Sequence, residues 1–324
     1  PQMPFRRFWQ LARPELGRLL LATVALLIST AMSLVYPQTI KIIMNALSGQ
    51  PKPEARTLIA QAALGLTAVF AVSGVFSAMR AYLFVVAGER VVARLRRQLF
   101  AAVIRQEIAF FDEQRIGELT NRLAADTTVL QNAVSSNISM LLRNGMMVVG
   151  GIAILVATSW RLTLVMLSIV PVVVLAAVFY GRMLRALSRE VQEALARSTE
   201  VAEETLAGIR TVRAFAREDL EAGRYGKAVE ASLELARKRA AAGAIFQGAV
   251  GFAGFAAVAA VLWYGGTLVL DGQMQVGDLT AFILYTLTVA ISFAAVSGLW
   301  GDFMRAAGAS ERVFELLDRK PRLP

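Results

Sequence analysis

Two of the side chains that are most often used in catalysis and metal binding, Cys and His, are missing from this sequence. Their absence excludes disulfides, thiolate nucleophiles, histidine metal sites and histidine-based catalytic triads. The GxxxxGK[ST] phosphate-binding loop is also missing, and Gly223–Ala228, its nearest imitation, has the wrong glycine spacing. We therefore expect no catalytic residue and no metal site in this chain.

The stretch with the richest polar chemistry is Phe110–Thr127, FFDEQRIGELTNRLAADT, which separates two long helical patterns. Gly117 permits a turn, and Glu118–Ala125 predicts a helix of barely two turns. Leu119 lies on one face of that short helix with Arg122 beside it. We call this segment the first elbow.

A second polar stretch, Gly208–Asp219, repeats the scheme with the sequence GIRTVRAFARED. Gly208 breaks the helical pattern, and Thr211–Glu218 predicts a short helix that exposes Val212 and Phe215. An exposed aromatic side chain on a short polar helix is typical of a docking surface. The alternative is that both elbows are ordinary loops with incidental apolar contacts, and spacing alone leaves this open.

The composition indicates what these elbows are attached to. The chain has 324 residues, of which 56% are hydrophobic, and a net charge of +10. The apolar residues cluster in windows of about 20, the length that crosses a bilayer. The fold class is therefore an all-α membrane protein with several spans. Lys and Arg mark the cytoplasmic loops of such proteins, so the basic excess does not require a nucleic-acid partner.

Six spans are predicted, with two long excursions beyond the lipid on the same side. The second helical pattern, about Thr57–Glu107, would measure about 75 Å, whereas the hydrocarbon core needs about 30 Å. Lys and Arg gather in the N-terminal segment, both elbows and the C-terminal segment, which predicts that both elbows and both termini are cytoplasmic. The spans are expected near residues 19–43, 57–107, 126–158, 162–180, 244–266 and 279–300, with the fourth continuing as a charged helix to about 206.

Four polar residues fall at membrane depth, where charges usually face a cavity or a partner. Arg80 lies in the second span, and Asn137, Arg143 and Asn144 lie in the third. They suggest a cationic cavity that favours anionic or amphipathic cargo. A structural pair, or snorkelling of the long side chains to the interface, is the alternative.

The chain resembles the transmembrane domain of ATP-binding cassette exporters with six helices and long intracellular extensions. Residues 81–100, AYLFVVAGERVVARLRRQLF, point to the branch of mitochondrial and antigen-peptide half-transporters, with its bacterial relatives. The other matching stretches are FFDEQRIGELTNRLAADT (110–127), WRLTLVMLSIVP (160–171), ETLAGIRTVRAFARE (204–218), GGTLVLDGQMQVGDLTAF (265–282) and ERVFELLDRKPRLP (311–324).

The resemblance implies that the two elbows are coupling helices that bind nucleotide-binding domains. Its matching positions are Gly117, Glu118, Leu119, Arg122 and Asp126 in the first elbow, and Thr211, Arg213, Phe215 and Glu218 in the second. It also implies that the fourth and fifth helices cross to a second transmembrane half, as a homodimer or a heterodimer. ATP and Mg²⁺ would be bound by the nucleotide-binding domain, so this chain alone should not hydrolyse ATP.

On that basis the chain divides into an interfacial helix (1–18), a six-helix domain (19–317) and the start of a linker to a nucleotide-binding domain (318–324). The first segment has a disordered tail as its alternative. The membrane would be a bacterial or organellar inner membrane, with the termini on the cytoplasmic or matrix side. One alternative is a secondary transporter or channel that works without a nucleotide-binding domain. Such a protein would show inverted repeats or buried acidic residues, and neither is evident in the sequence. A membrane scaffold is a further alternative. The cargo cannot be read from the sequence.

Overall fold

The structure is a computed structural model that describes residues 11, 13–49, 52–114 and 116–319, and among these no strand occurs. Most of the expected interfacial helix and of the expected linker lies outside this range. The elements are η1 (Arg13–Glu15), α2 (Leu16–Gly49), α3 (Lys52–Val103), α4 (Ile108–Glu113), α5 (Ile116–Asn121), η2 (Arg122–Asp126), α6 (Thr127–Asn132), η3 (Ala133–Asn137), α7 (Ile138–Thr158), α8 (Trp160–Ser168), α9 (Val170–Ala207), α10 (Ile209–Ala214), α11 (Glu218–Leu270) and α12 (Val276–Asp318).

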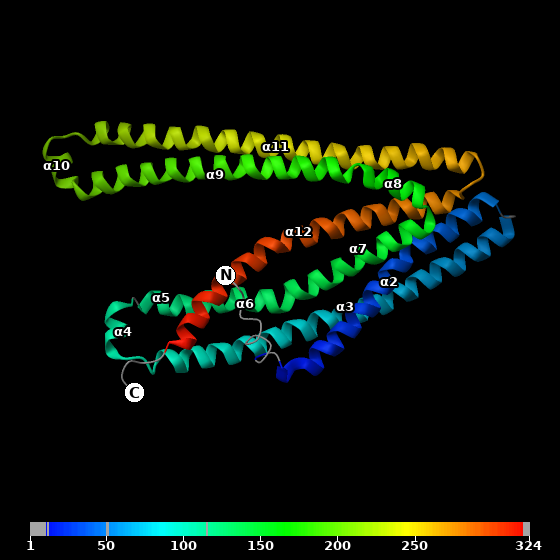
Figure 1. Cartoon of the computed structure of the whole chain (residues 1–324), viewed down its shortest axis with the longest axis horizontal. Helices are drawn as coiled ribbons and strands as arrows, with labels where there is room; N and C mark the ends of the chain where they lie inside the picture. Colours follow the sequence, from blue (N-terminus) through cyan, green and yellow to red (C-terminus); the bar gives the residue numbers. More distant parts are fainter. Residues whose placement is uncertain (1–10, 12, 50–51, 115, 320–324) are drawn as a thin grey trace. The chain divides into compact units, whose positions relative to one another are not determined.

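The prediction of six spans is confirmed. Within the described residues, six helical stretches are long and apolar enough to cross a membrane, and adjacent elements such as α8 and α9 merge within one stretch (Figure 1). The π-helical turns η2 and η3 lie within the third stretch. The stretches are Arg13–Ser48, Pro53–Val103, Ile116–Thr158, Trp160–Ala207, Glu218–Leu270 and Val276–Asp318.

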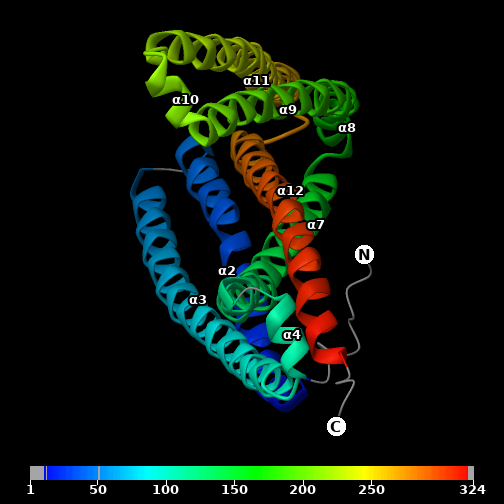
Figure 2. The same ribbon diagram turned by 90° about the vertical axis from the view of Figure 1, so that its left-hand side faces the viewer.

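The chain folds as two compact units. Unit 1 comprises Pro1–Ser159 and Leu268–Pro324, and unit 2 comprises Trp160–Thr267. In unit 1, α2 packs on α3, and α12 packs on both α2 and α7 (Figure 2). A buried apolar cluster joins the ends of these helices that lie near the first elbow to the elbow itself; it contains Leu95, Leu99, Val103, Phe110, Leu119, Leu130, Ala133, Ala306, Ala309, Val313 and Leu316.

At the opposite end of unit 1, α2 caps the start of α12. Gln275 precedes α12 but makes no side-chain cap. Instead, Asn45 of α2 accepts a hydrogen bond from the Gly277 amide at 2.9 Å and donates one to the Gln275 side chain at 2.5 Å. Lys41 adds an ion pair with Asp278 at 2.6 Å. Side chains of a neighbouring helix thus satisfy backbone donors that a helix start leaves unpaired.

Two prolines behave differently from each other. Pro37 lies inside the first span, where proline kinks a helix or removes a backbone hydrogen bond, and α2 continues as one helix on both sides of it. The Tyr285 hydroxyl donates to the Leu34 carbonyl at 2.5 Å, so α12 hydrogen-bonds the turn that precedes the proline. Pro171 does interrupt its span: α8 ends at Ser168 and α9 begins at Val170. Proline lacks the amide proton that would continue the helix and disfavours helical backbone in the residue before it.

Unit 2 is a helical hairpin in which α9 and α11 lie side by side and α10 joins them (Figures 1 and 2). Near α10, Arg224 pairs with Glu204 at 2.6 Å and Thr205 donates to Glu221 at 3.1 Å. Farther along the hairpin, the Tyr180 and Phe246 rings stack with centroids 4.0 Å apart. Polar contacts at one level and aromatic packing at another hold the two long helices together.

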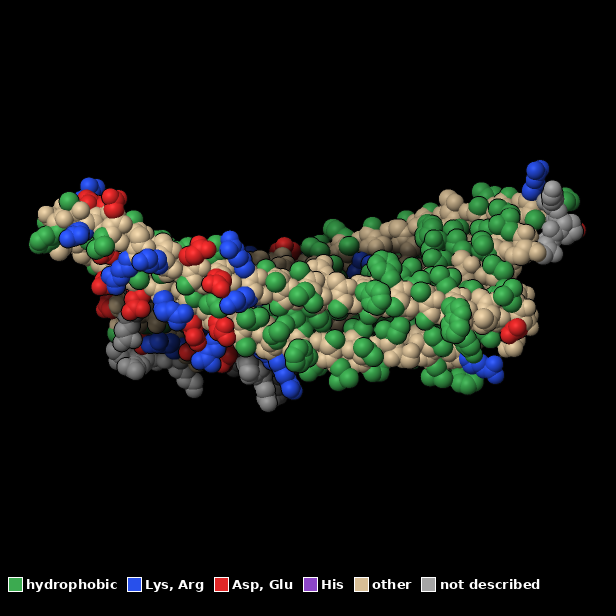
Figure 3. Space-filling model, turned by 90° about the horizontal axis from the view of Figure 1, so that it is seen from above, with side chains coloured by type: hydrophobic (Ala, Val, Ile, Leu, Met, Phe, Trp, Pro, Cys, Tyr) green, Lys and Arg blue, Asp and Glu red, His purple; other side chains and the backbone are tan. Residues whose placement is uncertain are grey.

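The surface divides by chemistry along these helices. Figure 3 shows charged side chains gathered toward one end of the visible helices and hydrophobic side chains over most of the remainder. In unit 2 the exposed apolar side chains are large: Phe179, Phe252, Phe255 and Trp263 are each at least 72% exposed. A soluble protein rarely shows such a continuous apolar surface. Together with the six spans, it identifies a multi-pass integral membrane protein.

The close approach of α2 and α12 gives a test of the fold. A Cβ added at Gly277 would lie 2.4 Å from both the Lys41 carbonyl oxygen and the Asn45 side-chain oxygen. We expect Gly277→Ala to destabilise the protein by about 1–3 kcal/mol through overpacking, measured as a lower melting temperature in detergent. Gly298→Ala on the same helix meets no atom within 4 Å and should leave the melting temperature unchanged or slightly higher. Equal melting of the two variants would contradict the α2–α12 packing.

Candidate functional site

The long helix that leads into the first elbow, α3, ends earlier in the chain than the sequence predicts. The second helical pattern was expected to run to about Glu107, but α3 ends at Val103 and Phe110 lies in the separate helix α4. The Gln106 amide donates to the Ala102 carbonyl at 3.3 Å and to the Arg319 carbonyl at 3.2 Å. This side chain satisfies one of the carbonyls left free at the end of α3 and simultaneously joins it to the chain after α12.

The short helix of the first elbow is α5, which continues directly into the π turn η2. Leu119 is buried in the apolar cluster of unit 1, whereas Gly117 and Glu118 are exposed. Arg122 donates to Glu118 at 2.7 Å, and its own side chain is only 16% exposed. The face available to a partner is therefore formed by the start of α5, and Leu119 and Arg122 hold that face in position.

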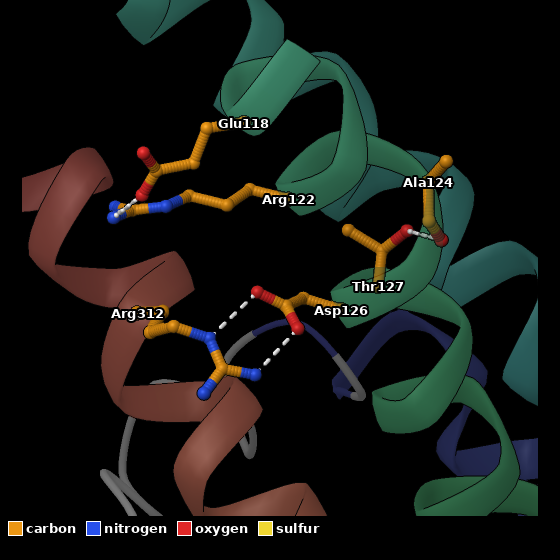
Figure 4. Close-up of polar contacts among 6 residues, drawn as sticks. All are labelled: Glu118, Arg122, Ala124, Asp126, Thr127 and Arg312. Atoms are coloured by element: carbon orange, nitrogen blue, oxygen red, sulfur yellow. Dashed lines mark hydrogen bonds and ion pairs between the residues drawn. The ribbon is translucent and has the colours of Figure 1, made fainter. Parts of the chain in front are cut away.

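Asp126 is turned inward and binds α12. Its two carboxylate oxygens accept hydrogen bonds from Nε and Nη2 of Arg312 at 2.9 and 2.6 Å (Figure 4). The Asp126 side chain is 9% exposed and that of Arg312 is 51% exposed. A bidentate Arg–carboxylate pair is among the strongest and most directional polar contacts. The resemblance groups Asp126 with the partner-binding positions, but the structure gives it an internal contact.

Arg319 provides a second connection between the end of α12 and the first elbow. It pairs with Glu107 at 3.0 Å, and its guanidinium lies 4.4 Å from the centre of the Phe110 ring. A hollow of about 500 Å³ opens beside these groups. It is lined by Phe110, Gln114, Arg122, Glu315, Leu316, Asp318 and Arg319.

The second elbow is built in a different way. Its helix, α10, has no buried residue, and Phe215, immediately after it, is 73% exposed. The Arg217 amide donates to Val212 and the Ala216 amide to Arg213, while Ala216 has a left-handed φ of 49°. These bonds form a Schellman motif, which usually places Gly where Ala216 stands. The motif ends α10 at Ala214, so Phe215 sits at the tip of the elbow.

The predicted helix Thr211–Glu218 was therefore placed too far along the chain. Thr211 and Arg213 lie within α10, whereas Glu218 is the first residue of α11. Arg213 and Glu218 face each other across the turn at 3.3 Å. Thr211, Arg213, Phe215 and Glu218 are all exposed, and Val212, expected to be exposed, is half-buried.

The four polar residues at membrane depth do not form one cluster. Asn137 is buried and its amide donates to Asp302 at 3.4 Å, and Asn144 bonds the Met140 carbonyl of its own helix at 2.9 Å. Arg80 donates to Ser139, and Arg143 is exposed on the surface of unit 1. Arg80 and Arg143 are within electrostatic reach of one another.

The residues that sequence reasoning missed all lie at contacts between distant segments. Arg312, Arg319, Glu107 and Gln106 fix the first elbow, yet in the sequence each looks like an ordinary charged or polar residue of a polar helical segment. The pairing partners are 186 residues apart for Asp126–Arg312 and 212 for Glu107–Arg319. Local spacing carries no signal for such pairs.

A family model described as "ABC transporter transmembrane region" matches residues 19–293. The chain is 39% identical, over 98% of its length, to "ABC transporter B family member 1" of Dictyostelium discoideum. It is 39% identical over 97% of its length to "ATP-binding cassette sub-family B member 10, mitochondrial" of Mus musculus, and 36% identical over 98% to "ATP-dependent permease MDL1, mitochondrial" of Schizosaccharomyces pombe. The chain spans 35%, 44% and 44% of these relatives' lengths, respectively.

The ion pair between Asp126 and Arg312 gives a prediction about the first elbow. Asp126→Asn keeps the shape of the side chain but removes the charge that the Arg312 guanidinium binds. We expect the free energy of local opening to fall by about 1–2 kcal/mol, so that backbone amides over residues 116–126 exchange with deuterium about tenfold faster.

The control is Glu193→Gln, which removes the exposed pair with Arg189 on α9. Exposed pairs contribute about 0–1 kcal/mol, so exchange along α9 should change little. An unaltered rate over residues 116–126 in Asp126→Asn would show that this pair does not hold the elbow.

Proposed function

The chain belongs to the family of ABC transporter transmembrane regions, and from this we propose that it is the substrate-translocating half of an ATP-driven exporter. In this proposal α5 and α10 are coupling helices that bind nucleotide-binding domains, where ATP and Mg²⁺ are held. Both elbows and both termini lie on the cytoplasmic or matrix side. The observation that carries the proposal is that each elbow joins long helices beyond their apolar parts and ends in an exposed surface.

The two elbows would play different parts in coupling. The first is joined to the α12 end through Asp126–Arg312 and Glu107–Arg319, so a push on α5 is passed into α12 directly. The second has its described polar contacts within its own hairpin and presents Phe215, an aromatic side chain that can fill a pocket on a partner. Aromatic anchors of this kind contribute most of the binding energy at many interfaces.

The division into two units favours assembly with a second transmembrane half. The fourth and fifth spans form unit 2, which packs as an independent hairpin with large exposed apolar side chains. We propose that these two helices cross to a partner half, as a homodimer or heterodimer, and bind its nucleotide-binding domain through α10. Phe252 and Phe255 would then face the partner or the lipid.

Transport would proceed by alternating access. To reverse a 1:99 preference between inward-facing and outward-facing states, nucleotide binding must supply about 5.5 kcal/mol of differential affinity. Within this chain only mechanical contact at the elbows can deliver it, because the sequence carries no nucleotide-binding loop of its own. Elbows that are rigidly joined to the spans transmit such a force, whereas flexible loops would dissipate it.

Phe215 gives the sharpest test of coupling. In the chain joined to its nucleotide-binding domain, we expect Phe215→Ala to weaken the elbow–motor contact by about 2 kcal/mol, which is roughly a 30-fold loss of contact affinity. ATP-dependent transport into vesicles should fall by about tenfold or more. The melting temperature should stay the same, because the side chain is 73% exposed and contributes little to the fold.

Leu195→Ala is the matched control, since Leu195 lies on α9 and is 49% exposed but is remote from the elbow in sequence. It should leave both transport and melting unchanged. A scaffold or a transporter without a motor predicts no difference between the two variants, so equal transport would remove the proposal.

A further inference from the structure

Two arginines of unit 1 lie at membrane depth with no ion-pair partner among its described residues. Arg80 follows an uncharged run on α3 that begins at Thr57, and Arg143 precedes an uncharged run on α7 that ends at Thr158. The nearby carboxylates have other partners: Asp302 pairs with Arg305 and accepts from Asn137, and Glu89 accepts from Gln131.

The contacts of Arg80 bring the two cations together. Its Nη1 donates to the Ser139 hydroxyl of α7. Ser139 and Arg143 are four residues apart on that helix, so they lie on the same face. The two guanidinium groups are within electrostatic reach of one another, and the Nε of Arg80 is buried without a hydrogen-bond acceptor.

This arrangement is incomplete by itself. Like charges repel strongly where the surroundings exclude water, and charges inside membranes are normally paired. An anionic group between the guanidiniums would remove the repulsion and could accept hydrogen bonds from both. A bidentate carboxylate or phosphate group matches the geometry of guanidinium donors.

The neighbouring side chains indicate the rest of the ligand. Leu83 lies one turn from Arg80 on α3, and Met146 lies one turn from Arg143 on α7. Both pack on one apolar cluster that contains Ala22, Leu26 and Phe84. This cluster is buried, but Met140, which lies one turn before Arg143 on α7, is 52% exposed. The two cations therefore have an exposed apolar side chain beside them, which suits a molecule with an anionic head and an apolar body.

We infer that Arg80, Arg143 and Ser139 form a binding site for the carboxylate or phosphate head of an amphipathic anion. The inference rests on the proposed function only in treating such an anion as the class of molecule that is transported. The same chemistry is offered by the headgroup of an anionic phospholipid, and the experiment distinguishes the two sources.

The test measures binding without ATP, using the chain joined to its nucleotide-binding domain in phosphatidylcholine nanodiscs. The probes are fluorescent dansyl-undecanoate and its uncharged methyl ester. The wild type should bind the anion at least about tenfold more tightly than the ester, and Arg80→Gln with Arg143→Gln should abolish that preference. Arg80→Lys with Arg143→Lys keeps both charges and should retain most of it, which separates charge from damage to the fold.

Arg56→Gln is the matched control, because it removes an exposed arginine near the start of α3 and should leave the preference unchanged. Adding phosphatidylglycerol to the nanodiscs identifies the source. If phosphatidylglycerol weakens dansyl-undecanoate binding to the wild type but not to the double Gln variant, the site binds lipid headgroups. If phosphatidylglycerol leaves dansyl-undecanoate binding to the wild type unchanged, the site binds cargo and not lipid.

Equal affinity for anion and ester in the wild type, or an unchanged preference in the double Gln variant, would overturn the inference. Neither result bears on the coupling proposal, because binding is measured without nucleotide and both elbows are intact. Conversely, normal transport by Phe215→Ala would contradict the coupling proposal but would not affect the inference of an anion site.

Discussion

The ion pair between Asp126 and Arg312 acts where the lipid cannot help. Inside a bilayer, helices are confined by the membrane and need only modest contacts with each other. Beyond the hydrocarbon that confinement ends, and side chains must hold the helices together. In unit 1 this is done by one buried apolar cluster together with Asp126–Arg312 and Glu107–Arg319. The first elbow is therefore part of the core of the unit rather than a loop attached to it.

The second elbow, in contrast, is not part of a buried core. α10 buries no residue, and its position depends on the α9–α11 hairpin and on the Schellman turn at Ala216. That turn uses a left-handed backbone that is unfavourable for any residue with a Cβ by about 1–2 kcal/mol. This unfavourable backbone conformation directly follows Phe215, the exposed aromatic side chain at the end of α10.

Most of the architecture could be predicted from the sequence, since apolar windows and charge asymmetry report directly on a bilayer. The six spans and the presence of two elbows needed nothing more. The helix ends were harder, because Gln106 stops α3 with the help of Arg319, more than 200 positions away. The inward turn of Asp126 was also hidden: η2 and η3 each insert a residue into the helical repeat, so a 3.6-residue wheel assigns the faces around them wrongly.

Because α10 contains no buried residue, its sequence is free to evolve with little effect on folding. A substitution in α10 replaces no buried residue, so unit 2 should fold with many different side chains there. Substitutions at Leu119 or Asp126 disturb the packing of unit 1 directly. If α10 binds a partner as proposed, the preference for that partner can change at little cost to folding, whereas the first elbow is expected to change more slowly.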